Sequence, residues 1–108
     1  MLQTNEIQQR MTHIQQTIGE AEQACSAADG TSPELTACIR KMVEDAKQVE
    51  SVIASNDQAR IIERVDGLED MGDEAKRLSR SDAHMSPQVE TAVTRVHAEL
   101  SQLKHMLH

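Results

Sequence analysis

Apolar residues recur at alternating spacings of four and three in four separate segments of this chain. Such a seven-residue repeat lines up one narrow apolar face along each helix and keeps that face against a neighbouring helix. The composition agrees with helix, because Phe, Tyr and Trp are absent whereas Ala, Gln, Glu, Leu, Met and Arg are common. The repeat therefore predicts an all-α protein whose helices pack together in coiled-coil fashion.

The first two segments predict a helical hairpin over residues 4–54. Its first helix is expected over residues 4–28 and ends at Asp29-Gly30, because glycine accepts the left-handed conformation that closes a helix. Its second helix opens at Ser32-Pro33, where serine can cap the first turn and proline fits it. The apolar faces of this hairpin are Ile7, Met11, Ile14, Ile18, Ala21, Cys25 and Ala28, and then Leu35, Ile39, Met42, Ala46, Val49 and Ile53.

The last two segments predict a second hairpin over residues 58–107. The residues Ser55-Asn56-Asp57 separate it from the first, since they favour caps over helix interiors. Gly67 and Gly72 weaken its first helix, each by about 1 kcal/mol relative to Ala. After a loop over residues 81–86 its second helix opens at Ser86-Pro87. The apolar faces are Ile61, Val65, Leu68, Ala75 and Leu78, and then Val89, Val93, Val96, Leu100, Leu103 and Leu107.

The two hairpins correspond to each other along the sequence. A shift of 54 residues, half the chain, lays Ser32-Pro33 on Ser86-Pro87 without a gap. The same shift lays the apolar positions of the second helix on those of the fourth. We interpret this as an internal duplication within one domain, residues 1–108, with convergence of two similar hairpins as the alternative.

In two antiparallel helices, the residue numbers of each facing pair add up to the same value, called here the index sum. It is 63 in the first hairpin and 171 in the second. In this register Ala46 faces Ile18, and Gly72 lies opposite Leu100. A small residue therefore faces a large one in each hairpin. Such alternation lets the layers of a core interdigitate at native density.

Further apolar residues lie beside the apolar faces of the last three helices. They widen these faces beyond what a two-helix pair can bury, so another surface must cover them. The hairpins can stack into an antiparallel four-helix bundle, which we favour, or the two central helices can fuse into a rod that dimerises. These flanking residues are also the candidate surface for a protein partner: Val43, Val52, Ile62, Met71, Leu78 and Met106.

Two cysteines face each other in the first hairpin. Cys25 and Cys38 share its index sum of 63, so a disulfide between them is one hypothesis. It would close a loop of about 14 residues and contribute about 3 kcal/mol. The alternative is a pair of buried thiols in a reducing compartment. The sequence leaves both open, and it has neither Cys-x-x-Cys nor zinc-site spacing.

The spacing of the histidines and carboxylates along the sequence matches no metal-binding motif. We therefore assign no metal or cofactor to them. His105 and His108 lie three apart near a helix end, where a weak metal chelate is the alternative to solvated side chains. His97 is expected at the edge of an apolar face. Most members of an acidic group are expected on the solvated face of the third helix, with a divalent-cation or basic-partner site as the alternative: Asp66, Glu69, Asp70, Asp73 and Glu74.

Charge and composition exclude several classes of function. A net charge of −7 without a basic run disfavours nucleic acids and anionic membrane surfaces, and no aromatic ring is present to stack on a base. No apolar stretch approaches the roughly 20 residues that span a bilayer. Without a signal peptide the expected compartment is the cytoplasm, or the periplasm or outside of the cell if a leader has been removed.

No nucleophile with a base beside it and no phosphate-binding glycine loop is visible, so neither an enzyme nor a small-molecule substrate is predicted. The predicted function is a helical protein–protein interaction module that self-associates or binds a partner protein. It would serve as an adaptor, chaperone-like or regulatory accessory protein. The alternative is a small metal-binding stress or resistance protein that uses His105, His108 and the carboxylates.

Overall fold

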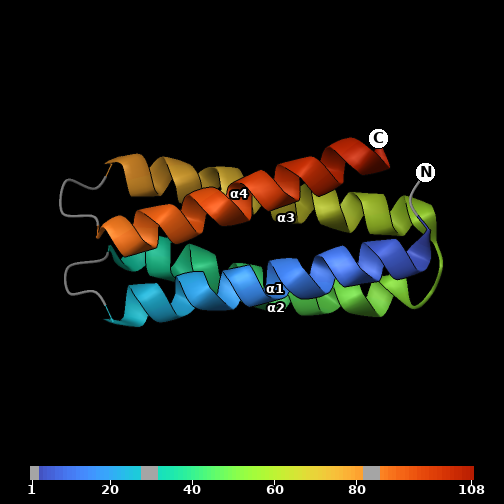
Figure 1. Ribbon diagram of the computed structural model, residues 1–108, viewed down its shortest axis with the longest axis horizontal. Helices are drawn as coiled ribbons and strands as arrows, with labels where there is room; N and C mark the ends of the chain where they lie inside the picture. The colour runs from blue at the N-terminus through green and yellow to red at the C-terminus, as the bar shows by residue number, and fades with distance from the viewer. Residues whose placement is uncertain (1–2, 28–31, 82–85) are drawn as a thin grey trace.

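The computed structural model describes residues 3–27, 32–81 and 86–108, and four helices account for nearly all of them. The helices are α1 (Thr4–Ala27), α2 (Pro33–Ile53), α3 (Gln58–Ser81) and α4 (Pro87–Leu107). They lie side by side along a molecule of 42 × 20 × 17 Å, as Figure 1 shows. Helices α1 and α3 each pack against both α2 and α4. The predicted four-helix bundle is confirmed, and the fused rod is wrong.

Helices α2 and α4 begin in the same way. The Ser32 hydroxyl accepts a hydrogen bond from the backbone N–H of Leu35 at 3.1 Å, and the Ser86 hydroxyl accepts one from Gln88 at 3.3 Å. Both serines are extended and a proline follows each of them in the first turn. The predicted Ser-Pro starts are therefore confirmed. The predicted end of the first helix, from Ala28 to Gly30, lies outside the described residues, as does the loop that carries His84.

The chain turns between α2 and α3 where the sequence predicts a break. Asn56 has a φ of 59°, in the left-handed region that asparagine tolerates better than most residues. The Ser55 hydroxyl donates to a carbonyl oxygen in the last turn of α2 at 2.6 Å. The Asp57 carboxylate accepts from the backbone N–H of Arg60 at 3.3 Å, at the start of α3. These local bonds satisfy backbone groups that a continuous helix would have paired internally.

The core is one apolar interior to which all four helices contribute. Every described position of the predicted apolar faces is buried except Leu78, which is half-buried. In the last turn of α3 the buried position is Ser79 instead, and its hydroxyl donates to the Lys76 carbonyl oxygen at 2.8 Å. The seven-residue repeat of α3 therefore runs through Gly72 and Ser79, two positions that an apolar pattern does not mark.

The 54-residue correspondence holds for the structure as well as for the sequence. Adding 54 to the bounds of α1 and α2 gives the bounds of α3 and α4. The same shift lays every buried position of α4 on a buried position of α2. It does so for every buried position of α3 except Glu69, whose counterpart Gln15 is half-buried. Matching bounds and matching burial fit an internal duplication and convergence of two similar hairpins alike, and Glu69 departs from the shared pattern.

The glycines of α1 and α3 have very different surroundings. A Cβ atom added to Gly72 would lie 3.3 Å from Leu100 Cδ1, which confirms that these two residues face each other. A Cβ atom added to Gly19 or Gly67 would meet nothing within 4 Å. Among the glycines of α1 and α3, Gly72 is therefore the one that serves the close packing of the helices.

Replacing Gly67 with alanine is expected to raise the free energy of unfolding by about 1 kcal/mol. Alanine loses less backbone entropy in a helix, and its methyl group meets no neighbour at this position. Gly72→Ala is the matched control, because its methyl group presses on Leu100 and offsets the same helical gain. Urea unfolding compares the two variants with the unchanged protein. Equal stability of Gly67→Ala and the unchanged protein would contradict this prediction.

Candidate metal centre

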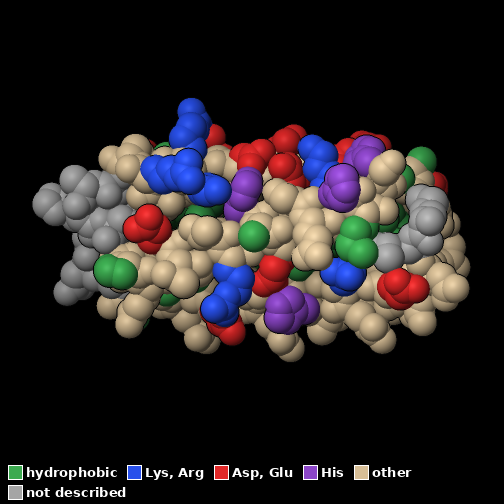
Figure 2. Space-filling model, turned by 45° about the horizontal axis from the view of Figure 1, so that its top comes forward, with side chains coloured by type: hydrophobic (Ala, Val, Ile, Leu, Met, Phe, Trp, Pro, Cys, Tyr) green, Lys and Arg blue, Asp and Glu red, His purple; other side chains and the backbone are tan. Residues whose placement is uncertain are grey.

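Acidic side chains of α3 face basic side chains of α4 along one edge of the bundle. Figure 2 shows this edge as a gathering of acidic, basic and histidine side chains over α3 and α4. Three pairs connect the two helices here: His97 with Asp73, Lys104 with Glu69 at 3.6 Å, and His108 with Asp66 at 2.9 Å. Among these six side chains, that of Glu69 is the most withdrawn from solvent.

Glu69 is the only charged residue that is buried among the described residues, with 7 % of its surface exposed. Its Oε2 atom is buried and accepts no hydrogen bond there. The ammonium group of Lys104 stays 3.6 Å away, beyond hydrogen-bond distance. Burial raises the pKa of Glu69, the negative charge of Asp73 raises it further, and Lys104 opposes both. An unsatisfied buried acceptor costs about 1–3 kcal/mol, so this site is short of one positive or hydrogen-bonding group.

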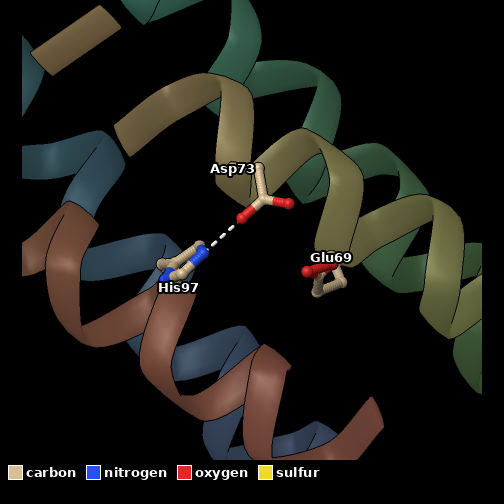
Figure 3. Close-up of side chains that lie close together, drawn as sticks. All are labelled: Glu69, Asp73 and His97. Atoms are coloured by element: carbon tan, nitrogen blue, oxygen red, sulfur yellow. Dashed lines mark hydrogen bonds and ion pairs between the residues drawn. The ribbon is translucent and has the colours of Figure 1, made fainter. Parts of the chain in front are cut away.

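Asp73 and His97 complete a cluster around Glu69. Each of the three residues offers a ligand atom, and these atoms lie within 4.8 Å of one another. Glu69 and Asp73 are four residues apart and so share one face of α3, while His97 reaches them from α4 (Figure 3). Ligands about 2.0–2.2 Å from a tetrahedral ion are roughly 3.4 Å apart. Small side-chain rotations would therefore bring the three onto one ion, which would enter by separating His97 from Asp73.

The donor set determines which ion fits. One imidazole nitrogen and two carboxylate oxygens suit a divalent transition metal such as zinc, whereas calcium and magnesium prefer oxygen ligands alone. Such an ion would give the unsatisfied oxygen of Glu69 a positive partner. It would also remove the repulsion between the carboxylates of Glu69 and Asp73. With three protein ligands, an ion of this class keeps at least one position for water.

The first hairpin shows that the bundle does not need these ionisable residues. At the positions related by 54 residues it has Gln15, Gly19 and Val43 in place of Glu69, Asp73 and His97. These three residues line a surface pocket between α1 and α2. The Gln15 side chain is satisfied there, since its amide donates to the Ala46 carbonyl oxygen at 3.1 Å. The helices therefore pack at this place with neutral side chains, and the cluster is a feature of the second hairpin alone.

The structure corrects the predicted placement of the acidic group. Asp70 and Asp73 are exposed as expected, and Asp66 and Glu74 are half-buried, but Glu69 does not lie on a solvated face. The physical reason is its position next to the fully buried Leu68, on the side of α3 that α4 covers. An acidic residue adjacent to an apolar face was the available signal for this burial.

The chelate of His105 and His108, which the sequence offered as the alternative to solvated side chains, stays a hypothesis, and the two histidines have different surroundings. His108 Nε2 lies 2.9 and 3.0 Å from the two carboxylate oxygens of Asp66. His105 is exposed, and neither histidine belongs to the cluster of metal-ligating groups that the described residues form. The histidine of that cluster is His97, which the sequence placed only at the edge of an apolar face.

Both cysteines are free thiols in the structure. Cys38 Sγ donates to the carbonyl oxygen of Met71 at 3.5 Å and is thus engaged with α3. Burial raises the pKa of both thiols, with a further increase from Glu22 at Cys25 and from Glu74 at Cys38. A raised pKa keeps a thiol protonated and weakly nucleophilic at neutral pH. The two sulfur atoms are unbonded in the structure, and the disulfide stays a prediction.

The residues predicted as an interaction surface contribute mainly to the packing of the bundle. Val52 is buried, Met106 is half-buried, and four more are half-buried and packed against the core: Val43, Ile62, Met71 and Leu78. The covering surface that these side chains require is supplied in large part by the protein itself. Binding of a partner through them stays a prediction.

No known protein family, curated protein or solved structure matches this chain. Among the helices that the structure describes, none is both long and apolar enough to cross a membrane. The case for a function therefore depends on the geometry of the cluster between α3 and α4.

Proposed function

We propose that this protein is a non-enzymatic metal-binding bundle that holds one divalent transition-metal ion of the zinc class at Glu69, Asp73 and His97. The observation that supports the proposal most directly is the buried Oε2 atom of Glu69, which has no hydrogen-bond donor. Two further ligand atoms, from Asp73 and His97, lie within 4.8 Å of the ligand atom of Glu69. A buried carboxylate with one unsatisfied oxygen, next to two other ligand groups, is an arrangement that a cation stabilises.

Binding at this place is coupled to protons and to the packing of the helices. Glu69 must be ionised to bind a metal, and burial raises its pKa, so affinity falls as the pH falls through that value. The ligands come from two helices, so the ion connects α3 to α4. A ligand that binds only the folded state stabilises it by mass action, by about 2.7 kcal/mol at a hundredfold excess over the Kd.

Calorimetric titration with zinc, combined with thermal unfolding, tests this proposal. One zinc ion per chain and a raised Tm are expected at pH 7, with little effect from calcium or magnesium. The matched control is one variant with three substitutions, Glu69→Gln, Asp73→Gly and His97→Val. Each introduces the residue that the first hairpin has 54 positions earlier. This variant should fold, because the first hairpin packs with those residues, and should lose zinc binding.

A second variant tests the alternative site near the chain end. His105→Gln with His108→Gln should leave zinc affinity unchanged, because neither residue belongs to the cluster. Full zinc affinity in the first-hairpin variant, or its loss in the variant without these two histidines, would show that the ion binds elsewhere.

The predicted binding of a protein partner or a second copy is independent of the metal site. Light scattering with and without zinc separates the two. A monomer in both conditions would remove self-association and leave the metal proposal intact.

A further inference from the structure

We infer that Lys104 is a built-in competitor of the metal ion, an inference that rests on the metal site proposed above. Its Nζ atom lies 3.6 Å from Glu69 Oε2, the buried oxygen that lacks a hydrogen-bond donor. At this distance the ammonium group balances the charge of the carboxylate without forming a hydrogen bond to it. Lys104 thus holds the place of a cation next to Glu69 but does not satisfy this oxygen.

The side chain of Lys104 is able to leave this position. It is 38 % exposed, and its flexible four-carbon stem can carry the ammonium group toward solvent. A surface pocket beside Glu69 gives it room on α4, with Ser101, His105 and His108 as the other lining residues. No movement of a helix is needed to exchange one cation for another at Glu69.

Exchange of cations has a consequence for affinity. An ammonium group and a divalent ion repel each other, and both are attracted to the same carboxylate. Binding of the metal must therefore break the ion pair of Lys104 with Glu69 and keep the ammonium group at a distance. The work of this displacement weakens metal binding and favours release, as a reversible carrier or sensor requires.

The test compares zinc affinity in three full-length variants. Lys104→Met removes the charge and keeps a long flexible stem, and its Kd for zinc is expected to be about tenfold lower than that of the unchanged protein. Lys104→Arg keeps the charge and should change the Kd by less than about twofold. Lys41→Met, on the exposed face of α2, controls for the loss of one positive charge that is not part of the cluster.

Labelling with an amine-reactive reagent gives a second readout. Saturating zinc should increase the labelling rate of Lys104, because its ion pair is broken, and should leave Lys41 unchanged. Equal or weaker zinc binding by Lys104→Met, or labelling of Lys104 that zinc leaves unchanged or slows, would overturn the inference while the metal site stands. Absence of zinc binding in every variant would overturn the proposed function and this inference together.

Discussion

Replacing Leu100 with alanine is expected to lower the free energy of unfolding by about 3 kcal/mol. Leu100 is fully buried in α4, and its side chain lies over Gly72 of α3. The substitution removes three carbon atoms from the core, and glycine has no side chain that could move into the space. Leu100→Ala therefore leaves a cavity opposite Gly72 that the surrounding side chains are unable to fill.

The first hairpin supplies the variant that should restore this packing. At the positions related by 54 residues it has Ile18 and Ala46, so the large residue lies on the other helix. Adding Gly72→Ile to Leu100→Ala reproduces that pair and should recover more than half of the lost stability. Gly72→Ile alone should be destabilising, because its side chain would collide with Leu100.

Urea unfolding of the two single variants and the double variant forms a double-mutant cycle. The two changes should couple by more than about 1 kcal/mol, in the sense that each compensates the other. If the losses of unfolding free energy in the two single variants simply added up in the double variant, residues 72 and 100 would not be in contact. Gly67→Ile with Leu100→Ala is the control, since a Cβ atom at Gly67 meets nothing within 4 Å.

Local chemistry and periodicity account for most of the fold. The four-and-three spacing fixes which side of each helix is buried, and Ser32-Pro33 and Ser86-Pro87 fix two helix starts through hydrogen bonds that the sequence implies. A constant index sum was enough to place Gly72 opposite Leu100. These features depend on neighbours within one helix or one hairpin, which is why the sequence predicts them.

The candidate site was missed for a different reason. An index sum of 171 places Asp73 next to His97, which have a sum of 170, so the register of the hairpin predicts this one contact. Burial of Glu69 depends on how closely α4 covers the edge of α3. The lack of a hydrogen-bond donor at its carboxylate depends on the position of the Lys104 ammonium group, which lies 3.6 Å from the Oε2 atom. Neither property is a matter of spacing along one chain.

Glu69→Gln is expected to stabilise the metal-free protein at neutral pH and to have little effect at acidic pH. The pKa of Glu69 is raised by burial above its ordinary value of 4.5. The unfolded chain therefore loses this proton at a lower pH than the folded protein does. The contribution of Glu69 to stability is complete below pH 4.5 and is lost as the pH rises through the raised pKa of the folded state.

Glutamine does not ionise, so its variant avoids that loss. Its amide can donate to the Leu100 carbonyl oxygen, as Gln15 donates to the Ala46 carbonyl oxygen in the first hairpin. The difference in free energy of unfolding should grow between about pH 4 and about pH 7, in favour of the variant. Urea unfolding across this range measures it. Glu63→Gln, an exposed change on the same helix, should show no such growth.

Saturating zinc should reverse the order of the two proteins at neutral pH. The ion binds the buried carboxylate of Glu69, one oxygen of which has no hydrogen-bond donor, so the unchanged protein gains stability by mass action. A neutral amide is a much poorer metal ligand than a carboxylate, so the Glu69→Gln variant should gain little. The carboxylate of Glu69 would thus destabilise the metal-free protein and stabilise the metal-bound one. This is a trade-off between stability and function. If the variant were more stable than the unchanged protein in zinc as well, the burial of Glu69 would have no connection with a metal.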